Sequence, residues 1–174
     1  MAQRNEFLDE ELLDEEEDEE ILKDKYLAFR LGDEDYALDI ACVTEIIGMQ
    51  PINRVPDMPG YIKGVINIRG RVVPVMDVRL RVRMDERAYD TRTCIIVILL
   101  NGNNLGLIVD RVSEVVYMPE EDIEARPTIS MKVRDQFIRG MGKVNGQVKM
   151  IMDVNRLLHQ RDLSILEQAV KTSL

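Results

Sequence analysis

The sequence predicts an all-β protein built from two small, similar β lobes and followed by a C-terminal helix. Short runs in which apolar and polar residues alternate are separated by clusters of turn residues, as in strands joined by tight turns. The first half of the folded part also recurs in the second half, which indicates an internal duplication. We expect the folded domain over 23–160, with lobe one at about 23–90, lobe two at about 91–158, and the helix over 161–174.

The composition divides the chain into an acidic tail and a nearly neutral body. Of its 174 residues, 45% are hydrophobic and 32% are charged, which is ordinary for a soluble globular protein. Residues 1–20 hold eleven acidic side chains and one basic one, whereas the other 154 residues hold 21 acidic and 22 basic ones. A neutral body with few aromatic residues disfavours a nucleic-acid-binding barrel, which needs a basic face and stacking platforms.

We expect residues 1–22 to form a disordered acidic tail. The run DEELLDEEEDEE at 9–20 repels itself at neutral pH and has too little apolar surface to fold alone. It is either a solvated tail or a decoy that screens a basic surface, and the sequence does not decide between the two. The segment lacks the apolar stretch of a secretory signal, and no run in the chain reaches the roughly 18 apolar residues of a membrane span.

Lobe one begins with a predicted hairpin. Apolar side chains alternate at 27–31 and again at 36–40, and the turn residues 32–35 separate the two runs. After a short break, residues 43–47 form a candidate third strand, and a loop over 50–61 follows.

A second hairpin over 62–78 shows the duplication most clearly. Shifted by 76 residues, it falls without gaps on 138–154, and Gly64 meets Gly140. A shift of 69 residues places the first hairpin on 96–107. Each repeat thus holds four or five short strands. Such a unit closes most economically as a small barrel, because closure removes exposed sheet edges.

The turn of the second hairpin carries an unexpected residue, Arg69, before Gly70. Favoured two-residue turns need a positive φ at both central residues, and Asn145–Gly146 in the second copy suits them. We expect Arg69 to keep a right-handed conformation, with only Gly70 left-handed, because a positive φ would strain an arginine. The Arg69 side chain has three candidate environments: water, a partner, or an ion pair with Glu45 that adds about 0–1 kcal/mol if exposed.

The end of the chain is predicted to be helical. Asp153 is positioned to cap a short helix over 154–159. The run Ser164–Glu167 has the signature of a capping box at the start of a further helix. One face of that helix carries four apolar residues, Ile165, Leu166, Ala169 and Val170. The helix either packs on the lobes or is a mobile element that binds a partner.

Four segments together carry a family resemblance: YLAFRLGDEDYALDIACVTEIIG at 26–48, INRVPDMPGYIKGVINIRGRVVPVMDVR at 52–79, LGLIVDRVSEVV at 105–116 and IRGMGKVNGQVKMIMDVNRLL at 138–158. The chain resembles the CheW family of chemotaxis coupling proteins. The resemblance covers about 25–158, nearly the whole folded part, and its most specific piece is IKGVINIRGRVVPVMDVR.

The resemblance implies two SH3-like five-stranded barrels with strands exchanged between the halves. It also implies a cytoplasmic, non-enzymatic adaptor without a cofactor, monomeric when isolated and recruited to membrane-associated receptor arrays without inserting into the membrane. Its partners would be the cytoplasmic tip of methyl-accepting chemoreceptors and the regulatory domain of the histidine kinase CheA. The alternative is an adaptor of a non-flagellar chemosensory pathway for gene regulation or surface motility. A barrel that binds a small ligand between its lobes is the rival outside the family.

Carried over residue by residue, the resemblance implies a receptor-facing set: Val43, Glu45, Gly64, Asn67 and Arg69. Gly64 either lets a receptor helix approach its backbone or meets a φ requirement, and Val43 is either an interface or a core residue. The kinase contact should use apolar residues on the barrel ends, for which the candidates are Val109, Val112, Val115 and Ile151. Each of these four could equally be a core residue.

The sequence offers no residues for an enzymatic reaction. Its one histidine, His159, has no second His or thiolate at metal-ligand spacing. Cys42 and Cys94 lie in apolar runs and are interpreted as reduced core residues of a cytosolic protein. Asp77 and Asp153 recur at equivalent positions and are interpreted as caps rather than as paired catalytic carboxylates.

Overall fold

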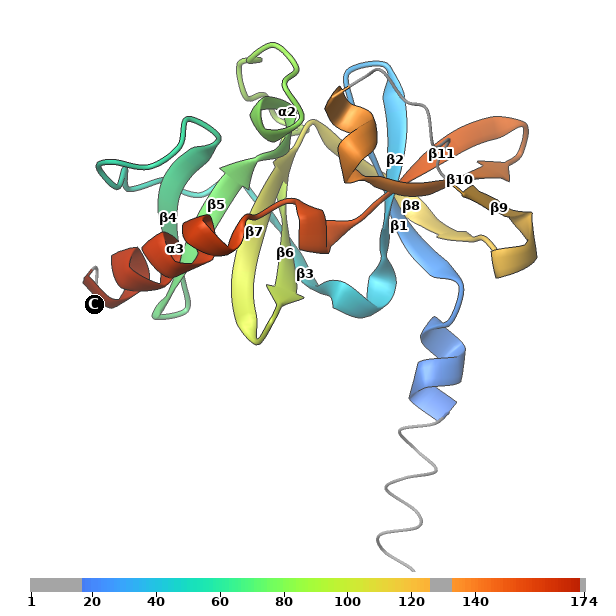
Figure 1. The fold of residues 1–174 in the computed structure, drawn as a ribbon, viewed down its shortest axis with the longest axis horizontal. Coiled ribbons are helices and arrows are strands. Elements are labelled where there is room, and N and C mark those ends of the chain that lie inside the picture. The colour runs from blue at the N-terminus through green and yellow to red at the C-terminus, as the bar shows by residue number, and fades with distance from the viewer. Residues whose placement is uncertain (1–16, 126–132, 173–174) are drawn as a thin grey trace, which may run out of the picture.

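The computed structural model describes residues 17–125 and 133–172, which form two β lobes side by side (Figure 1). The five-stranded lobe has the strand order β3 (Val43–Gly48), β6 (Cys94–Leu100), β7 (Asn103–Val109), β5 (Arg71–Asp77) and β4 (Ile62–Ile68). The six-stranded lobe has the strand order β8 (Arg111–Tyr117), β1 (Lys25–Leu31), β2 (Glu34–Asp39), β11 (Gln147–Met152), β10 (Ile138–Val144) and β9 (Ile123–Ala125).

The two sheets have the same strand order, as the duplication predicts. The first hairpin of each repeat (β1–β2 or β6–β7) lies between the third strand and the second hairpin of the opposite repeat. In both sheets the two hairpins meet in a parallel pair, β2 beside β11 and β5 beside β7. An isolated bridge between Asn53 and Val65 takes the place of β9 in the five-stranded lobe. Each lobe therefore contains one hairpin from the other half of the sequence.

The all-β fold class with two lobes and a C-terminal helix is confirmed. Over the described residues, however, the hydrogen-bonded ladder of each sheet has two ends and does not close into a full barrel. The edge strands are β3 and β4 in one lobe and β8 and β9 in the other. The equivalent strands β3 and β8 are thus both edge strands, one on each lobe.

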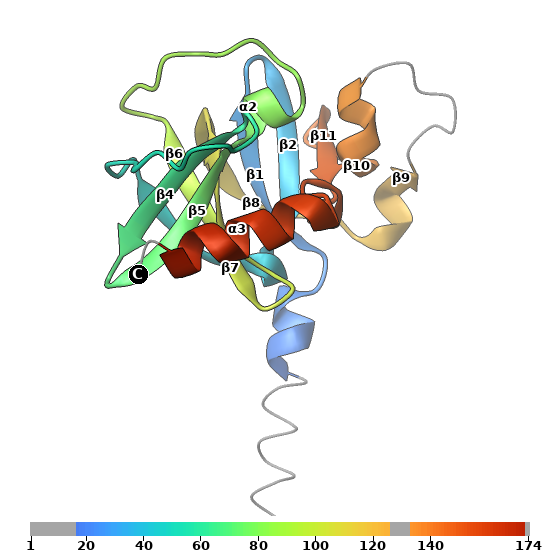
Figure 2. The same ribbon diagram turned by 60° about the vertical axis from the view of Figure 1, so that its left-hand side comes forward.

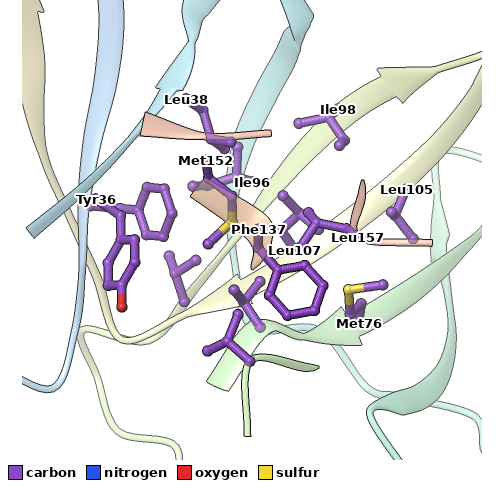
Figure 3. Packing of buried hydrophobic residues seen from close by; sticks show 14 of the residues in the cluster. Tyr36, Leu38, Met76, Ile96, Ile98, Leu105, Leu107, Phe137, Met152 and Leu157 are labelled. Carbon is purple, nitrogen blue, oxygen red and sulfur yellow. The ribbon is translucent and has the colours of Figure 1, made fainter. Parts of the chain in front are cut away.

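The largest apolar cluster lies at the joint between the lobes, where the two exchanged hairpins face each other (Figure 3). Strand β6 buries both of its faces. Ile96 and Ile98 pack into the joint, whereas Ile95 and Val97 fill the interior of the five-stranded lobe. This is why its sequence, CIIVILL, is continuously apolar rather than alternating. Full burial of each such side chain contributes about 1.5–3 kcal/mol, so separating the lobes would be strongly unfavourable.

Polar and aromatic contacts also link the lobes at the joint. The short helix α2 (Val78–Arg81) ends in Arg81, whose guanidinium lies 4.8 Å from the ring centre of Tyr61 and 4.6 Å from that of Phe137. Phe137 belongs to the 3-10 helix η3 (Val133–Phe137), just before β10. Arg81 therefore connects the five-stranded lobe with the start of the second hairpin of the other repeat.

The C-terminal helix α3 (Gln160–Thr172) runs across the five-stranded lobe (Figure 2). It begins one turn before Ser164, so the predicted capping-box start is wrong. The first turn is instead anchored by Asp162, whose carboxylate accepts a hydrogen bond from Tyr61 Oη at 2.5 Å. Leu166 is buried in the joint cluster, and Ile165 remains 37% exposed. The helix thus packs on the lobes, and the side chain of Ala169 lies outside the described set.

Part of the expected acidic tail, residues 17–22, is helical and projects from the start of β1 (Figure 1). The remainder of that tail, 1–16, lies outside the described residues, as do 126–132 and 173–174. Within the described part of the chain, no helix combines the length and the apolar character needed to cross a membrane.

Candidate functional site

Glu45 and Arg69 form an ion pair that joins the two edges of the five-stranded sheet. Glu45 lies on edge strand β3, and Arg69 lies in the turn between β5 and the opposite edge strand β4. Arg69 Nη2 is 2.7 Å from Glu45 Oε1 and 2.8 Å from Oε2. The Arg69 side chain remains 75% exposed, and that of Glu45 is 28% exposed. Of the three candidate environments for Arg69, the structure therefore contains the ion pair, with other guanidinium donors still facing water.

The conformation predicted for Arg69 is wrong. Its φ is +49°, and that of Gly70 is +82°, so both central residues are left-handed. The equivalent pair Asn145–Gly146 has φ values of +51° and +77°. The right-handed twist of the strands imposes this primed turn on both hairpins, even though an arginine with positive φ costs about 1–2 kcal/mol. The twist of the hairpin outweighs the preference of the residue.

Asn67 stabilises the same turn from the preceding strand. Its Oδ1 accepts a hydrogen bond from the backbone N of Gly70 at 2.9 Å. Asn67 is itself exposed, so the rest of its amide group is open to water. Three of the five residues expected to face the receptor, Glu45, Asn67 and Arg69, are thus one connected polar group at one end of the five-stranded lobe.

Gly64 has a role within the fold. Its φ is +143°, and a Cβ at this position would lie 2.1 Å from the backbone O of Asn53. Asn53 exchanges two backbone hydrogen bonds with Val65, each 2.8 Å long, so the close approach is fixed. Gly64 is buried. Gly64 therefore meets a φ requirement and also allows a close backbone approach. The backbone that approaches is the Asn53 segment of this chain.

Apolar side chains accompany the polar group, and sequence reasoning missed two of them. Val43 is half-buried and packs against the joint cluster. Leu99 on β6 is 50% exposed, and Ile46 on β3 is 46% exposed but points to the opposite face of the sheet from its neighbour Glu45. Glu45 pairs with Val97, and Leu99 lies two residues farther along β6, so Leu99 and Glu45 share one face of the sheet. The signal that could have identified Leu99 is its position at the end of β6, two residues before the Asn101–Gly102 turn.

The four kinase-contact candidates fall into two groups. Val109 and Ile151 are each 1% exposed and lie in the joint cluster and in the interior of the six-stranded lobe, respectively. Val112 is half-buried, and Val115 is 54% exposed; both lie on edge strand β8. Tyr117, also on β8, is 62% exposed. The structure thus places a solvent-facing apolar surface on β8 and puts Val109 and Ile151 behind it as core residues.

Asp77 and Asp153, the two carboxylates that recur at equivalent positions, hold helix starts in place. Asp77 accepts hydrogen bonds from Leu80 N at 3.3 Å and from Tyr89 Oη at 2.8 Å, and its equivalent Asp153 accepts one from Asn155 N at 3.1 Å. Both are caps, as predicted, Asp77 for α2 and Asp153 for the 3-10 helix η4 (Val154–Arg156).

The two cysteines are free and half-buried. Burial, with a smaller contribution from Asp39, raises the pKa of the Cys42 thiol to about 11, and burial also raises the pKa of Cys94. Neither thiol is therefore activated as a nucleophile at neutral pH. Among the described residues, no group of three or more His, Cys, Asp or Glu side chains is arranged to hold a metal ion.

The chain is similar to chemotaxis proteins of known family over most of its length. Residues 25–162 match the family model of the CheW-like domain. The chain is 30% identical over 153 residues to the chemotaxis protein CheW of Klebsiella aerogenes, covering 88% of this chain and 92% of that one. It is 34% identical over 135 residues to that of Bacillus subtilis, covering 78% and 86%. The crystal structure of the scaffolding protein TtCheW from Thermoanaerobacter tengcongensis superposes with a TM-score of 0.74 at 32% identity, covering 80% and 94%.

Proposed function

The chain belongs to the CheW family of chemotaxis scaffold proteins, and from this premise we propose that it couples the cytoplasmic tips of chemoreceptors to the histidine kinase CheA. It does so without chemistry of its own, by holding both partners in one geometry that receptors can bias. The proposed place of action is the cytoplasmic side of membrane-associated receptor arrays.

The observation that carries this proposal is the presence of two equivalent edge strands, β3 and β8, on different lobes. Each presents exposed apolar side chains, Ile46 on β3 and Val115 on β8. The large apolar cluster at the joint holds the two edges in a fixed relation. A protein that binds two partners at once needs this arrangement, because a loose joint would uncouple the two faces.

We assign the receptor tip to the end of the five-stranded lobe. A helical hairpin could lay an apolar stripe on Leu99 while its polar side chains pair with Arg69 and Asn67, which keep unused donors. In this arrangement Glu45 orients the guanidinium. Gly64 and Val43 support the face from behind, Gly64 by allowing the Asn53 segment to approach β4.

We assign the kinase's regulatory domain to strand β8. Val115 supplies exposed apolar area, and half-buried Val112 continues it toward the joint. Val109 and Ile151 act indirectly in this proposal, by filling the two cores against which β8 is held. An open strand edge also offers unpaired backbone groups to a partner strand.

The test is an NMR titration of the full chain with a receptor-tip fragment and, separately, with the regulatory domain of CheA. We expect the receptor fragment to perturb residues near 43–47 and 64–70, and the kinase domain to perturb β8. Arg69→Ala should weaken only receptor binding, by about tenfold, and Val115→Asp only kinase binding. Asn145→Ala, in the equivalent turn of the other lobe, is the matched control. Absence of binding to both partners at about tens of micromolar would contradict the proposal, since scaffold contacts of ordinary interface size are at least this tight.

A further inference from the structure

A cleft that contains neither Glu45 nor Arg69 is rich in arginine. It lies where the end of β1, the start of β8 and the segment 83–93 meet, and its volume is about 280 Å³. We call it the arginine cleft. Its charged lining residues are Arg30, Arg87, Arg92, Arg111, Asp90 and Asp110. These six side chains leave an excess of two positive charges, in a body that is otherwise nearly neutral.

The two aspartates already have other partners, so neither is the counter-ion of Arg92 or Arg111. Asp110 Oδ2 accepts hydrogen bonds from Arg79 Nη1 and from the backbone N of Gly32, each at 2.7 Å. Arg87 reaches the same oxygen only at 3.4 Å. The closest ion-pair partner of Asp110 is therefore the largely buried Arg79, which does not line the cleft.

Asp90 is held within its own loop, and its Oδ2 also lies 3.5 Å from Nη2 of Arg87. Its Oδ1 accepts hydrogen bonds from the backbone N of Arg92 at 2.8 Å and of Thr93 at 3.2 Å. The first of these bonds in particular holds the pKa of Asp90 below its usual value, so the carboxylate stays ionised. These contacts fix the position of Arg92 in the loop. The Arg92 guanidinium itself has no ion-pair partner within the described ranges.

Two arginines stand directly opposite each other across β1 and β8. Arg30 is the register partner of Arg111, and like charges in this position destabilise a sheet. Arg30 Nε lies 3.3 Å from Asp35 Oδ1, but the buried atom forms no hydrogen bond. Asp35 is shared with the buried Lys149, whose Nζ lies 3.5 Å from its other oxygen. Arg111 has no ion pair in the described part of the chain.

We propose that the arginine cleft binds a phosphate-class dianion. Three guanidinium groups line it from three separate elements: Arg30 from β1, Arg111 from β8 and Arg92 from the segment 83–93. A tetrahedral dianion matches the two excess charges and accepts hydrogen bonds from several directions, whereas a carboxylate is planar and carries one charge. Binding would also relieve the repulsion between Arg30 and Arg111.

The test is a titration of the full-length protein with inorganic phosphate and with pyrophosphate at low ionic strength, followed by NMR of the backbone amides and the arginine Nε–Hε groups. We expect saturable shifts at Arg30, Arg92 and Arg111. Arg92→Ala and Arg111→Ala should each weaken the apparent affinity by about tenfold or more. Arg54→Ala, an exposed arginine outside the cleft, is the matched control. Shifts spread over all exposed arginines, or an unchanged affinity in Arg111→Ala, would overturn the proposal.

Thermal unfolding gives an independent readout. Without phosphate, Arg111→Thr should melt no lower than the wild type, because the like-charge pair is gone. Phosphate should raise the Tm of the wild type and leave that of Arg111→Thr nearly unchanged. An equal rise in both proteins would rule out the cleft as the site. Because no partner protein is present in either experiment, failure here does not touch the proposed docking faces.

Three peptides distinguish the source of the anion. A phosphoserine peptide that binds more tightly than free phosphate assigns the cleft to a phosphorylated protein. Tighter binding of pyrophosphate than of that peptide assigns it to a small phosphate compound, and both results support the proposal. The unphosphorylated peptide is the control. Binding of a peptide DEELLDEEEDEE, the chain's own acidic run, in the absence of phosphate binding would replace the proposal with a carboxylate site.

Discussion

The turns Arg69–Gly70 and Asn145–Gly146 have the same backbone and different side chains. Their first residues have φ values of +49° and +51°, and their second residues +82° and +77°. The backbone of the duplicated unit has thus been kept because the hairpin twist requires it. Asn suits this conformation and Arg does not, so the turn itself gives no reason for Arg69. The reason must lie in what the side chain reaches, which is Glu45 and, in our proposal, a receptor helix.

Gly64 and Gly140 occupy equivalent positions in the two repeats, and replacing them should show the largest difference in stability between the repeats. A Cβ on Gly64 would meet backbone fixed by two hydrogen bonds, and φ is +143° there. A Cβ on Gly140 would lie 2.7 Å from Glu124 O, but at an ordinary φ and against the three-residue edge strand β9. We expect Gly64→Ala to lower the free energy of unfolding by about 3 kcal/mol or more, and Gly140→Ala by about 1–2 kcal/mol.

Denaturant unfolding measures both variants, with the slope of the transition checked for two-state behaviour. Equal losses would show that the close approach at Asn53 is as easily relaxed as the one at β9. In that case Gly64 would have no special structural role, and its assignment to the receptor face would rest on the resemblance alone.

The second largest difference in stability is expected between the equivalent helix caps Asp77 and Asp153. Asp77 is 1% exposed and accepts from both Leu80 N and the Tyr89 hydroxyl, whereas Asp153 is half-buried, caps η4 and pairs with the exposed Arg156 at 3.4 Å. We expect Asp77→Ala to cost about 2–3 kcal/mol, because it removes both the cap of α2 and the bond to the Tyr89 hydroxyl from a buried position, and Asp153→Ala about 1 kcal/mol. Thermal unfolding of the two variants tests this order. Tyr89→Phe separates the two contributions, because it keeps the cap to Leu80 N and removes only the donor to the buried Oδ2 of Asp77.

Two tyrosines on opposite sides of the joint extend the comparison to alkaline pH. Burial, followed by the charge of Asp135, raises the pKa of Tyr36 to about 12. Burial, followed by the hydrogen bond to Asp162, raises the pKa of Tyr61 to about 12. The folded state keeps both protons where the unfolded chain, with a pKa near 10, loses them. This stabilising term is therefore fully present below pH of about 10 and is lost as pH rises to about 12.

Tyr36→Phe should abolish more of this pH dependence than Tyr61→Phe, because Tyr36 is fully buried and Tyr61 is partly exposed. We expect a difference from wild type of about 1–2 kcal/mol across the window for Tyr36 and less for Tyr61. Urea unfolding at several pH values measures it. Differences between variants are required, because Cys42 also contributes in the lower part of this range. A larger effect for Tyr61→Phe would contradict the order.

The strands and the duplication could be predicted from the sequence because local alternation and internal similarity encode them. The side chains that face solvent could not. Strands such as β6 are covered by the joint on one face and by a lobe interior on the other, so alternation does not separate a core residue from a surface one. For this reason Val109 and Ile151 could not be told apart from Val115 before the structure was known.

The contacts that define both sites arise from the curvature and pairing of the sheets. Glu45 meets Arg69 because opposite edges of one sheet curl toward each other. Arg30 meets Arg111 because β1 pairs with a strand of the other repeat. Neither pairing has a local signal in the sequence. The wrong prediction for Arg69 has a similar origin, since the preference of a single residue was weighed without the twist of the hairpin that contains it.

The smallest expected effect is the most informative about function. In a double-mutant cycle of Glu45→Gln and Arg69→Asn, we expect a coupling of about 0.2–1 kcal/mol that falls as salt is added, because the pair is exposed. Arg69→Asn alone should be nearly neutral or slightly stabilising, since relief of the left-handed arginine offsets the lost ion pair.

The reciprocal change, Asn145→Arg, should destabilise the other lobe by about 1 kcal/mol, because it introduces the same backbone strain. If this arginine recovers the loss by pairing with Glu114, the equivalent of Glu45, then Glu114→Gln should cost more in the Asn145→Arg background than in the wild type. A chain that is no less stable with Asn at position 69 has no folding reason to keep Arg there, so binding is left as the explanation. Should Arg69→Asn instead lower the free energy of unfolding by more than about 1 kcal/mol, the ion pair would be a structural closure of the sheet, and the receptor assignment of Arg69 would lose its main support.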